Sequence, residues 1–202
     1  MDTCLRNVYI TFFFGLLIFI GFMLLYKRLN APVMGGWGYL GILILLILLI
    51  YFISRMSMGI GKILVAIVFL AALAFIFYPL ILGLSSSDLW KFVLITLLFF
   101  VVLSVIVFLL PMQTFASWGK VLFILLILLI VFGIVGSIIF RDSPQFRLVF
   151  YILILLVFGG LIMYDTYRIA SGCGQQDAVN SAMSLILDTA NVFGATSGIG
   201  TL

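Results

Sequence analysis

KVLFILLILLIVFGIVGSIIF, residues 120–140, decides the fold class of this chain, because it carries a single charged residue and that residue stands at its first position. A helix of about 20 mostly apolar residues is long enough to span a lipid bilayer. The rest of the chain is similar: 66% of its 202 residues are hydrophobic, 8% are charged, and the mean hydropathy is +1.47. Soluble globular domains do not have this composition. We therefore predict an integral membrane protein.

Seven apolar stretches follow one another along the chain, at about residues 8–26, 39–54, 63–83, 91–110, 120–140, 147–168 and 178–200. Helix-breaking residues separate them, including Pro111 after the fourth stretch and Pro144 before the sixth. The first stretch is longer than the apolar core of a signal peptide and no A-x-A-like site follows it, so we expect it to stay in the protein. The pattern predicts an all-α membrane protein, with one seven-transmembrane-helix domain over residues 1–202.

The net charge of +4 does not indicate nucleic-acid binding, because the ten basic residues are scattered over the helix ends. This distribution is typical of side chains that anchor helices at the membrane interface. In a seven-span count, five basic residues lie on each side of the membrane, so the positive-inside rule assigns no orientation. The residues are Arg6, Lys27, Arg28, Arg55, Lys62, Lys91, Lys120, Arg141, Arg147 and Arg168.

Metal and redox chemistry have few residues to use in this sequence. The chain has no histidine and only two cysteines, Cys4 and Cys173. Zinc and haem sites depend on these residue types, so we expect no tightly bound cofactor. The span count places both cysteines on the same side of the membrane. A disulfide between them stays open, but we do not favour it, because two cysteines at this spacing form no framework.

The seventh apolar stretch differs from the others in carrying two stripes. Polar side chains at spacings of three, four and three share one helical face: Ser181, Ser184, Asp188 and Asn191. Small residues recur every four positions and allow another helix to approach closely: Ala190, Gly194 and Gly198. We therefore expect the last helix to be central in the bundle. The alternative is a packing helix whose serines only bond to backbone carbonyls.

Two aspartates, Asp165 and Asp188, lie inside the last two apolar stretches. A charged carboxylate at the centre of a membrane helix costs about 2.5–3.5 kcal/mol on insertion scales, so such residues usually face a bundle interior and serve a function. Two carboxylates in a low-dielectric interior cannot both ionise cheaply, and such a pair tends to share one proton. Arg168 lies three residues after Asp165, so an ion pair within the helix is the structural alternative for this aspartate.

These residues resemble the Bax inhibitor-1, or TMBIM, family of membrane proteins. Phe158 to Ile169, FGGLIMYDTYRI, is similar to the family pattern F-x-G-x-x-x-Y-D-T-Q-x-I. Asp177 to Phe193, DAVNSAMSLILDTANVF, is similar to the pattern D-Y-x-x-A-A-L-x-L-Y-L-D-I-I-N-L-F. Weaker likeness extends through Leu5 to Gly15 and through Thr114 to Phe123.

The resemblance implies a seven-helix fold with a central last helix, a pH-sensitive calcium leak and, in eukaryotic and viral members, suppression of cell death. The family's paired aspartates match Asp165 and Asp188, and its arginine near the end of the second helix matches Arg55. It implies the endoplasmic reticulum or Golgi membrane for a eukaryotic or viral protein and the plasma membrane for a bacterial one. The implied partners are the lipid bilayer, calcium, protons and apoptosis regulators or other membrane proteins.

The residues suggest how such a leak would be gated. A protonated carboxyl pair would join the sixth and seventh helices, and loss of the shared proton would create repulsion and attract a divalent cation. Calcium prefers six to eight oxygen ligands. Here the two carboxylates are supplemented only by Ser184, Asn191, backbone carbonyls and water, which predicts transient calcium contact, with Arg168 and Arg55 in supporting roles.

The sequence disfavours two other classes of membrane protein and leaves a third one open. Intramembrane aspartyl proteases share the Tyr164-Asp165 dipeptide, but their second motif, G-x-G-D, is missing before Asp188, so we do not expect an enzyme. A retinal protein needs a buried lysine in its last span, and residues 178–200 contain none. The main alternative is a non-conducting interaction protein that modulates death regulators or other channels, in which the aspartates only hold the fold.

Overall fold

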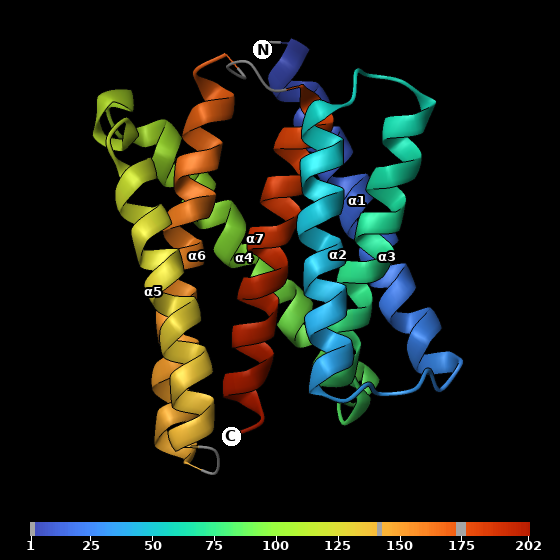
Figure 1. Ribbon diagram of the computed structural model, residues 1–202. Coiled ribbons are helices and arrows are strands. Elements are labelled where there is room, and N and C mark those ends of the chain that lie inside the picture. Colours follow the sequence, from blue (N-terminus) through green and yellow to red (C-terminus); the bar gives the residue numbers. More distant parts are fainter. Residues whose placement is uncertain (1–2, 141–142, 173–176) are drawn as a thin grey trace. The chain divides into compact units, whose positions relative to one another are not determined.

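The computed structural model describes residues 3–140, 143–172 and 177–202. This part of the chain forms seven α-helices and one short 3-10 helix (Figure 1). Their bounds are α1 Thr3–Arg28, α2 Gly36–Arg55, α3 Ile60–Leu82, α4 Ser86–Leu109, η1 Met112–Phe115, α5 Trp118–Ile139, α6 Pro144–Ala170 and α7 Ala178–Gly200. Each of the seven predicted stretches coincides with one helix to within a few residues. The prediction of an all-α membrane protein is confirmed.

The ends of the helices follow the sequence signals. Pro144 is the first residue of α6, where its missing N–H leaves no intrahelical bond unmade. Ser143 caps this end, since its Oγ accepts a hydrogen bond of 3.2 Å from the N–H of Phe146. Gly172 follows α6 with φ at +102°, a left-handed conformation that glycine adopts without strain. α3 continues through Pro79 to its end at Leu82.

Six helices of the described part, α1 to α6, are long and apolar enough to cross a membrane, judged by length and composition. The protein is therefore an integral, multi-pass membrane protein that contacts the lipid bilayer. α7 is long enough, but its polar stripe lowers its hydropathy. Protein covers α7 instead. Every α7 residue before Gly200 is buried or half-buried, whereas each of the other α-helices in the described part of the chain has exposed residues along its length. This burial agrees with the expected interior position of the last helix.

The helices form two compact units. The first unit comprises Met1–Ser85 with Gly172–Leu187, and the second comprises Ser86–Ser171 with Asp188–Leu202. The first half of α7 thus belongs to one unit and the second half to the other. The single domain over residues 1–202 stays a prediction.

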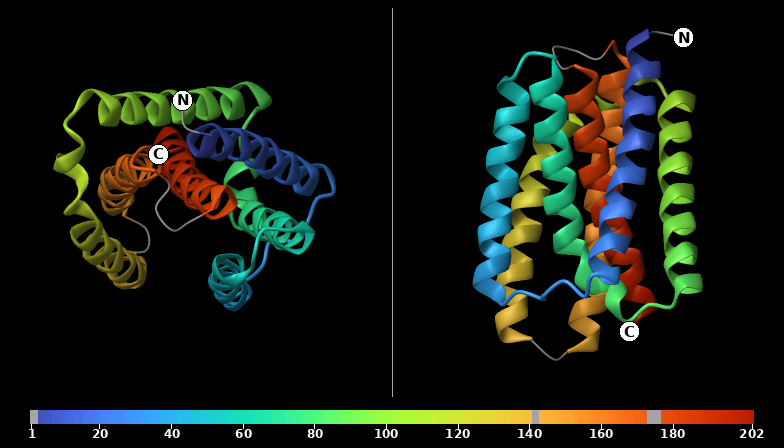
Figure 2. Two further views of the ribbon diagram at one scale, coloured as in Figure 1. Left: turned by 90° about the horizontal axis from the view of Figure 1, so that it is seen from above. Right: turned by 90° about the vertical axis from the view of Figure 1, so that its right-hand side faces the viewer.

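In the first unit, α3 packs against both α1 and α2 (Figure 2). The α1–α3 contact includes an edge-to-face pair of Phe19 and Phe77, whose ring centroids are 6.0 Å apart. Gly15 of α1 lies against Ile186 of α7, because a Cβ at Gly15 would come within 2.4 Å of the Ile186 side chain. A larger residue at position 15 would therefore have to displace the end of the Ile186 side chain, where α1 meets the first half of α7.

In the second unit, α6 packs against α4 and α5. The Leu122 side chain of α5 packs on Gly160 of α6, since a Cβ at Gly160 would come within 2.7 Å of that side chain. Hydroxyl groups join α4 to its two neighbours. Thr96 bonds to Thr196 of α7 at 3.2 Å. Ser104 bonds to Thr166 of α6 at 3.4 Å.

Lys62 lies at a helix end, as expected, but protein covers its side chain. Its side chain has no exposed surface, and its residue is 1% exposed. Among the other basic residues, Arg141 lies outside the described residues.

Cys4 is disulfide-bonded, contrary to our preference from the sequence, while Cys173 lies outside the described residues. The sequence prediction used only the number and the spacing of the cysteines. Neither quantity indicates which helix ends lie close together in the folded protein.

Candidate functional site

Asp165 lies in α6 with its side chain 15% exposed. Its Oδ1 accepts a hydrogen bond of 3.4 Å from the Arg168 guanidinium, so the intrahelical ion pair considered from the sequence is present. The Arg168 side chain is 39% exposed and lies over the Tyr164 ring, 5.8 Å from its centroid. The arginine therefore reaches toward the surface while it neutralises part of the charge on Asp165.

Asp188 lies in α7 and is 6% exposed. Its Oδ2 is fully buried and accepts no hydrogen bond from any residue that the structure describes. The carboxyl group of Asp165 is close enough to act on Asp188 by direct electrostatic repulsion. The structure thus brings the two predicted aspartates together, both within the second unit.

Close packing of α6 and α7 allows the two carboxyl groups to approach. Gly198 of α7 lies against Tyr151 of α6, where a Cβ would come within 2.4 Å of the tyrosine ring. Thr166, the residue after Asp165, is fully buried and bonds to Ser104 of α4. Gly198 therefore allows α7 to pack on Tyr151 of α6, and the Thr166 hydroxyl group joins α6 to α4 next to Asp165.

The arrangement has the chemistry of a proton site more than that of a tight metal site. In the described part of the chain, no hydrogen bond joins Asp165 to Asp188, and no group of three or more cysteine and acidic side chains could hold a metal ion. Asp165 has a cationic partner in Arg168, and Asp188 has none among the described residues. Two adjacent carboxyl groups in such surroundings exchange a proton more readily than they bind a cation firmly.

The other predicted residues lie around this pair to different extents. Arg168 contacts Asp165 directly, as described above. Asn191 is half-buried in the second half of α7. Ser184 belongs to the first unit, where it lines a cavity with Ser54 and Asn180. Arg55 also belongs to the first unit and is exposed, with its guanidinium 5.5 Å from the centroid of the Tyr51 ring.

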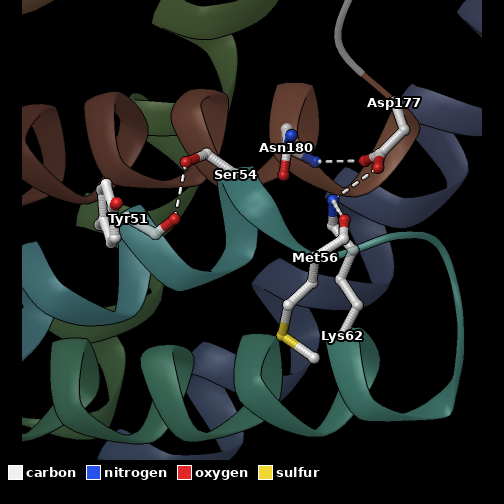
Figure 3. Close-up of polar contacts among 6 residues, drawn as sticks. All are labelled: Tyr51, Ser54, Met56, Lys62, Asp177 and Asn180. Carbon is white, nitrogen blue, oxygen red and sulfur yellow. Dashed lines mark hydrogen bonds and ion pairs between the residues drawn. The ribbon is translucent and has the colours of Figure 1, made fainter.

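The sequence analysis missed a second ionic contact, between Lys62 of α3 and Asp177 (Figure 3). The Nζ of Lys62 lies 2.5 Å from Oδ2 of Asp177 and donates a further bond of 3.2 Å to the carbonyl oxygen of Met56. A signal was present, because Lys62 lies in the first turn of α3, where the helix dipole disfavours a cation. A lysine at that position requires an anionic or carbonyl partner.

Comparisons with known proteins identify the family to which this chain belongs. A family model described as inhibitor of apoptosis-promoting Bax1 matches residues 1–196. Two Helicobacter pylori proteins, from strains 26695 and J99, are each 37% identical to this chain over 78 residues and are described as uncharacterized. Those segments cover 39% of this chain and 33% of each relative, so the chain spans about a third of the relatives it matches. Because the family model covers nearly the whole chain, the protein belongs to the Bax inhibitor-1 family.

Proposed function

We propose that this protein is a pH-sensitive calcium leak, gated by the carboxyl pair of Asp165 and Asp188. The observation that supports the proposal best is the state of Asp188. Its carboxyl group is buried, lies within electrostatic range of the Asp165 carboxyl group and has an oxygen without a donor among the described residues. A purely structural acidic residue in a membrane protein is normally paired. An unpaired one beside a like charge suits a group that changes its protonation.

In the proposed mechanism, one proton shared by the two carboxyl groups holds α6 and α7 together. When the proton leaves, the like charges repel each other and the helices separate locally. Arg168 lowers the cost of ionising Asp165 through their ion pair. The gate therefore closes when protonated and opens as the pH rises, because only the unprotonated pair carries the repulsion.

Calcium is the cargo in this proposal. The ionised pair supplies carboxylate oxygens, which calcium prefers, and Asn191, one turn after Asp188 on α7, can add another oxygen. Ser184, one turn before Asp188, is the other side-chain candidate, and water would complete the shell. So few protein ligands give weak binding, and a conducting site must let its ion leave. The supporting role of Arg55 stays a proposal that rests on the family resemblance.

The test is calcium flux into proteoliposomes, measured at several pH values for the wild-type protein, Asp165→Asn and Asp188→Asn. We expect the wild-type flux to rise with pH and both variants to lose this dependence. Asp88→Asn is the matched control, because the Asp88 side chain is 43% exposed and pairs with Lys91 at 2.8 Å. A pH dependence that survives in both test variants would contradict the gate.

The broader biological role rests on the same experiment. Suppression of cell death, and residence in the endoplasmic reticulum, Golgi or plasma membrane, are proposals carried by family membership. If the purified, folded protein passes no cations at any pH, the non-conducting interaction protein becomes the better explanation. The aspartate variants would then alter stability without altering transport.

A further inference from the structure

The ends of three helices meet at Lys62, within the first unit. Its Nζ, on the first turn of α3, donates both to the Asp177 carboxylate at the start of α7 and to the Met56 carbonyl at the end of α2. Figure 3 shows the lysine directed between these two oxygen acceptors. Lys62 therefore connects segments that lie 115 residues apart in the sequence.

The burial of this contact is unequal. The Lys62 side chain has no exposed surface, whereas the Asp177 side chain is 33% exposed. A buried ammonium without an anionic partner is strongly destabilising, since the cost of removing it from water is no longer offset. Asp177 can be hydrated by itself, but Lys62 cannot. Moving the start of α7 away from α3 would therefore leave the buried Lys62 ammonium without its anionic partner.

Asp177 also begins α7. Its Oδ1 accepts a hydrogen bond of 3.0 Å from the N–H of Asn180, and its own carbonyl accepts one of 3.2 Å from Ser181. This is the geometry of a helix N-cap, which satisfies a donor that the first turn leaves unpaired. One carboxylate therefore supports both the first turn of α7 and its attachment to α3.

Beyond this contact, α2 and the first half of α7 border a partly open space. A cavity of about 160 Å³ lies there, lined by Ile50, Ile53 and Ser54 of α2 and by Asn180, Met183, Ser184 and Leu187 of α7. The Oδ1 of Asn180 is buried and accepts no hydrogen bond from the described residues. An unsatisfied buried acceptor lowers the free energy needed to open a segment locally.

We propose that the Lys62–Asp177 pair is a fastening that keeps residues 178–187 against α2 and α3, and that its loss lets this half of α7 open while the second unit stays folded. Because Asp188 directly follows this segment on the same helix, opening would also ease release of the carboxyl gate. That last step rests on the proposed function. The fastening itself does not.

The first measurement is amide hydrogen exchange, in detergent or nanodiscs, on the full chain and three variants. Lys62→Met keeps the length of the side chain and removes the ammonium. Asp177→Asn removes the charge but retains an oxygen that can cap Asn180, whereas Asp177→Ala removes both. Lys91→Met is the control, since it breaks an exposed ion pair in the second unit.

We expect residues 178–187 to exchange at least about tenfold faster in Lys62→Met and Asp177→Asn, as for the loss of a buried ion pair. α5 and α6 should exchange as in the wild type, and the control should change neither region. Unchanged exchange of residues 178–187 in both variants would overturn the proposal. A change in Asp177→Ala alone would do so too, because it would assign the whole effect to the helix cap.

Calcium flux supplies the second measurement and separates the two proposals. If the wild-type protein conducts, Lys62→Met should increase flux at a pH where the wild type is closed. Conduction that is the same in wild type and variant would refute the link between fastening and gate. A wild-type protein that conducts nothing would refute the proposed leak, while hydrogen exchange would still decide whether the pair fastens α7.

Discussion

Replacing Asp188 with asparagine should stabilise the protein while it removes the proposed gate. Asp188 is 6% exposed, its Oδ2 accepts no hydrogen bond from the described residues, and the Asp165 carboxyl group lies within electrostatic range of it. Asparagine has nearly the same shape, carries no charge and supplies two N–H donors. The amide can donate to the neighbouring carboxylate, so repulsion is replaced by a hydrogen bond.

The magnitude follows from the unsatisfied oxygen. A buried polar group without a partner costs about 1–3 kcal/mol. We therefore expect the free energy of unfolding to rise by about 1–3 kcal/mol in Asp188→Asn. Asp88→Asn is the control, because the exposed Asp88–Lys91 pair should contribute about 0–1 kcal/mol.

Equilibrium unfolding in detergent micelles measures this difference, at one fixed pH at which the wild-type pair has lost its shared proton and the two carboxylates repel each other. Wild type, Asp188→Asn and Asp88→Asn should be compared at the same detergent concentration, with the fold of each variant checked by circular dichroism. A loss of stability in Asp188→Asn, beyond that of the control, would refute the reasoning. It would mean that the wild-type carboxylate makes a favourable contact that the amide cannot replace.

Two further predictions concern the neighbourhood of the pair. Arg168→Gln should move the midpoint of pH-dependent flux to higher pH, because the guanidinium no longer favours the ionised form of Asp165. Arg147 is exposed on the same helix, so Arg147→Gln is the control and should leave the midpoint unchanged. Equal midpoints in the wild type and both variants would count against the role of Arg168. Gly198→Val should lower the free energy of unfolding by about 1–3 kcal/mol through overpacking against Tyr151, which denaturant unfolding would detect. A neutral effect of this substitution would mean that α6 and α7 are not tightly packed there.

The sequence predicted the helices well because each is encoded locally. An uninterrupted apolar run such as residues 120–140 has one physical solution in a bilayer, a helix, and proline or glycine marks its ends. The interior position of α7 was also predictable, because a polar stripe is tolerated in a membrane protein only where protein covers it. The ion pair of Asp165 with Arg168 could be considered from their spacing of three residues.

Contacts between distant segments could not be predicted in this way. In the sequence, Lys62 looks like an exposed lysine at a helix end. Its burial depends on the contact with Asp177, which lies more than a hundred residues away, so no local pattern indicates it. The missing donor at Asp188 is likewise a property of the packed helices, since no sequence pattern reports which oxygen remains unpaired. Both features depend on tertiary structure, and both involve charges whose partners the local sequence does not contain.

The central claim, that Asp165 and Asp188 hold one proton between them and lose it when the protein opens, is tested most directly by infrared spectroscopy of protein with isotope-labelled aspartate. We predict one protonated carboxyl band in the wild type that disappears over the same pH range in which calcium flux rises, and that is absent from this range in Asp188→Asn. A rise in flux without any change in the carboxyl band would contradict the account.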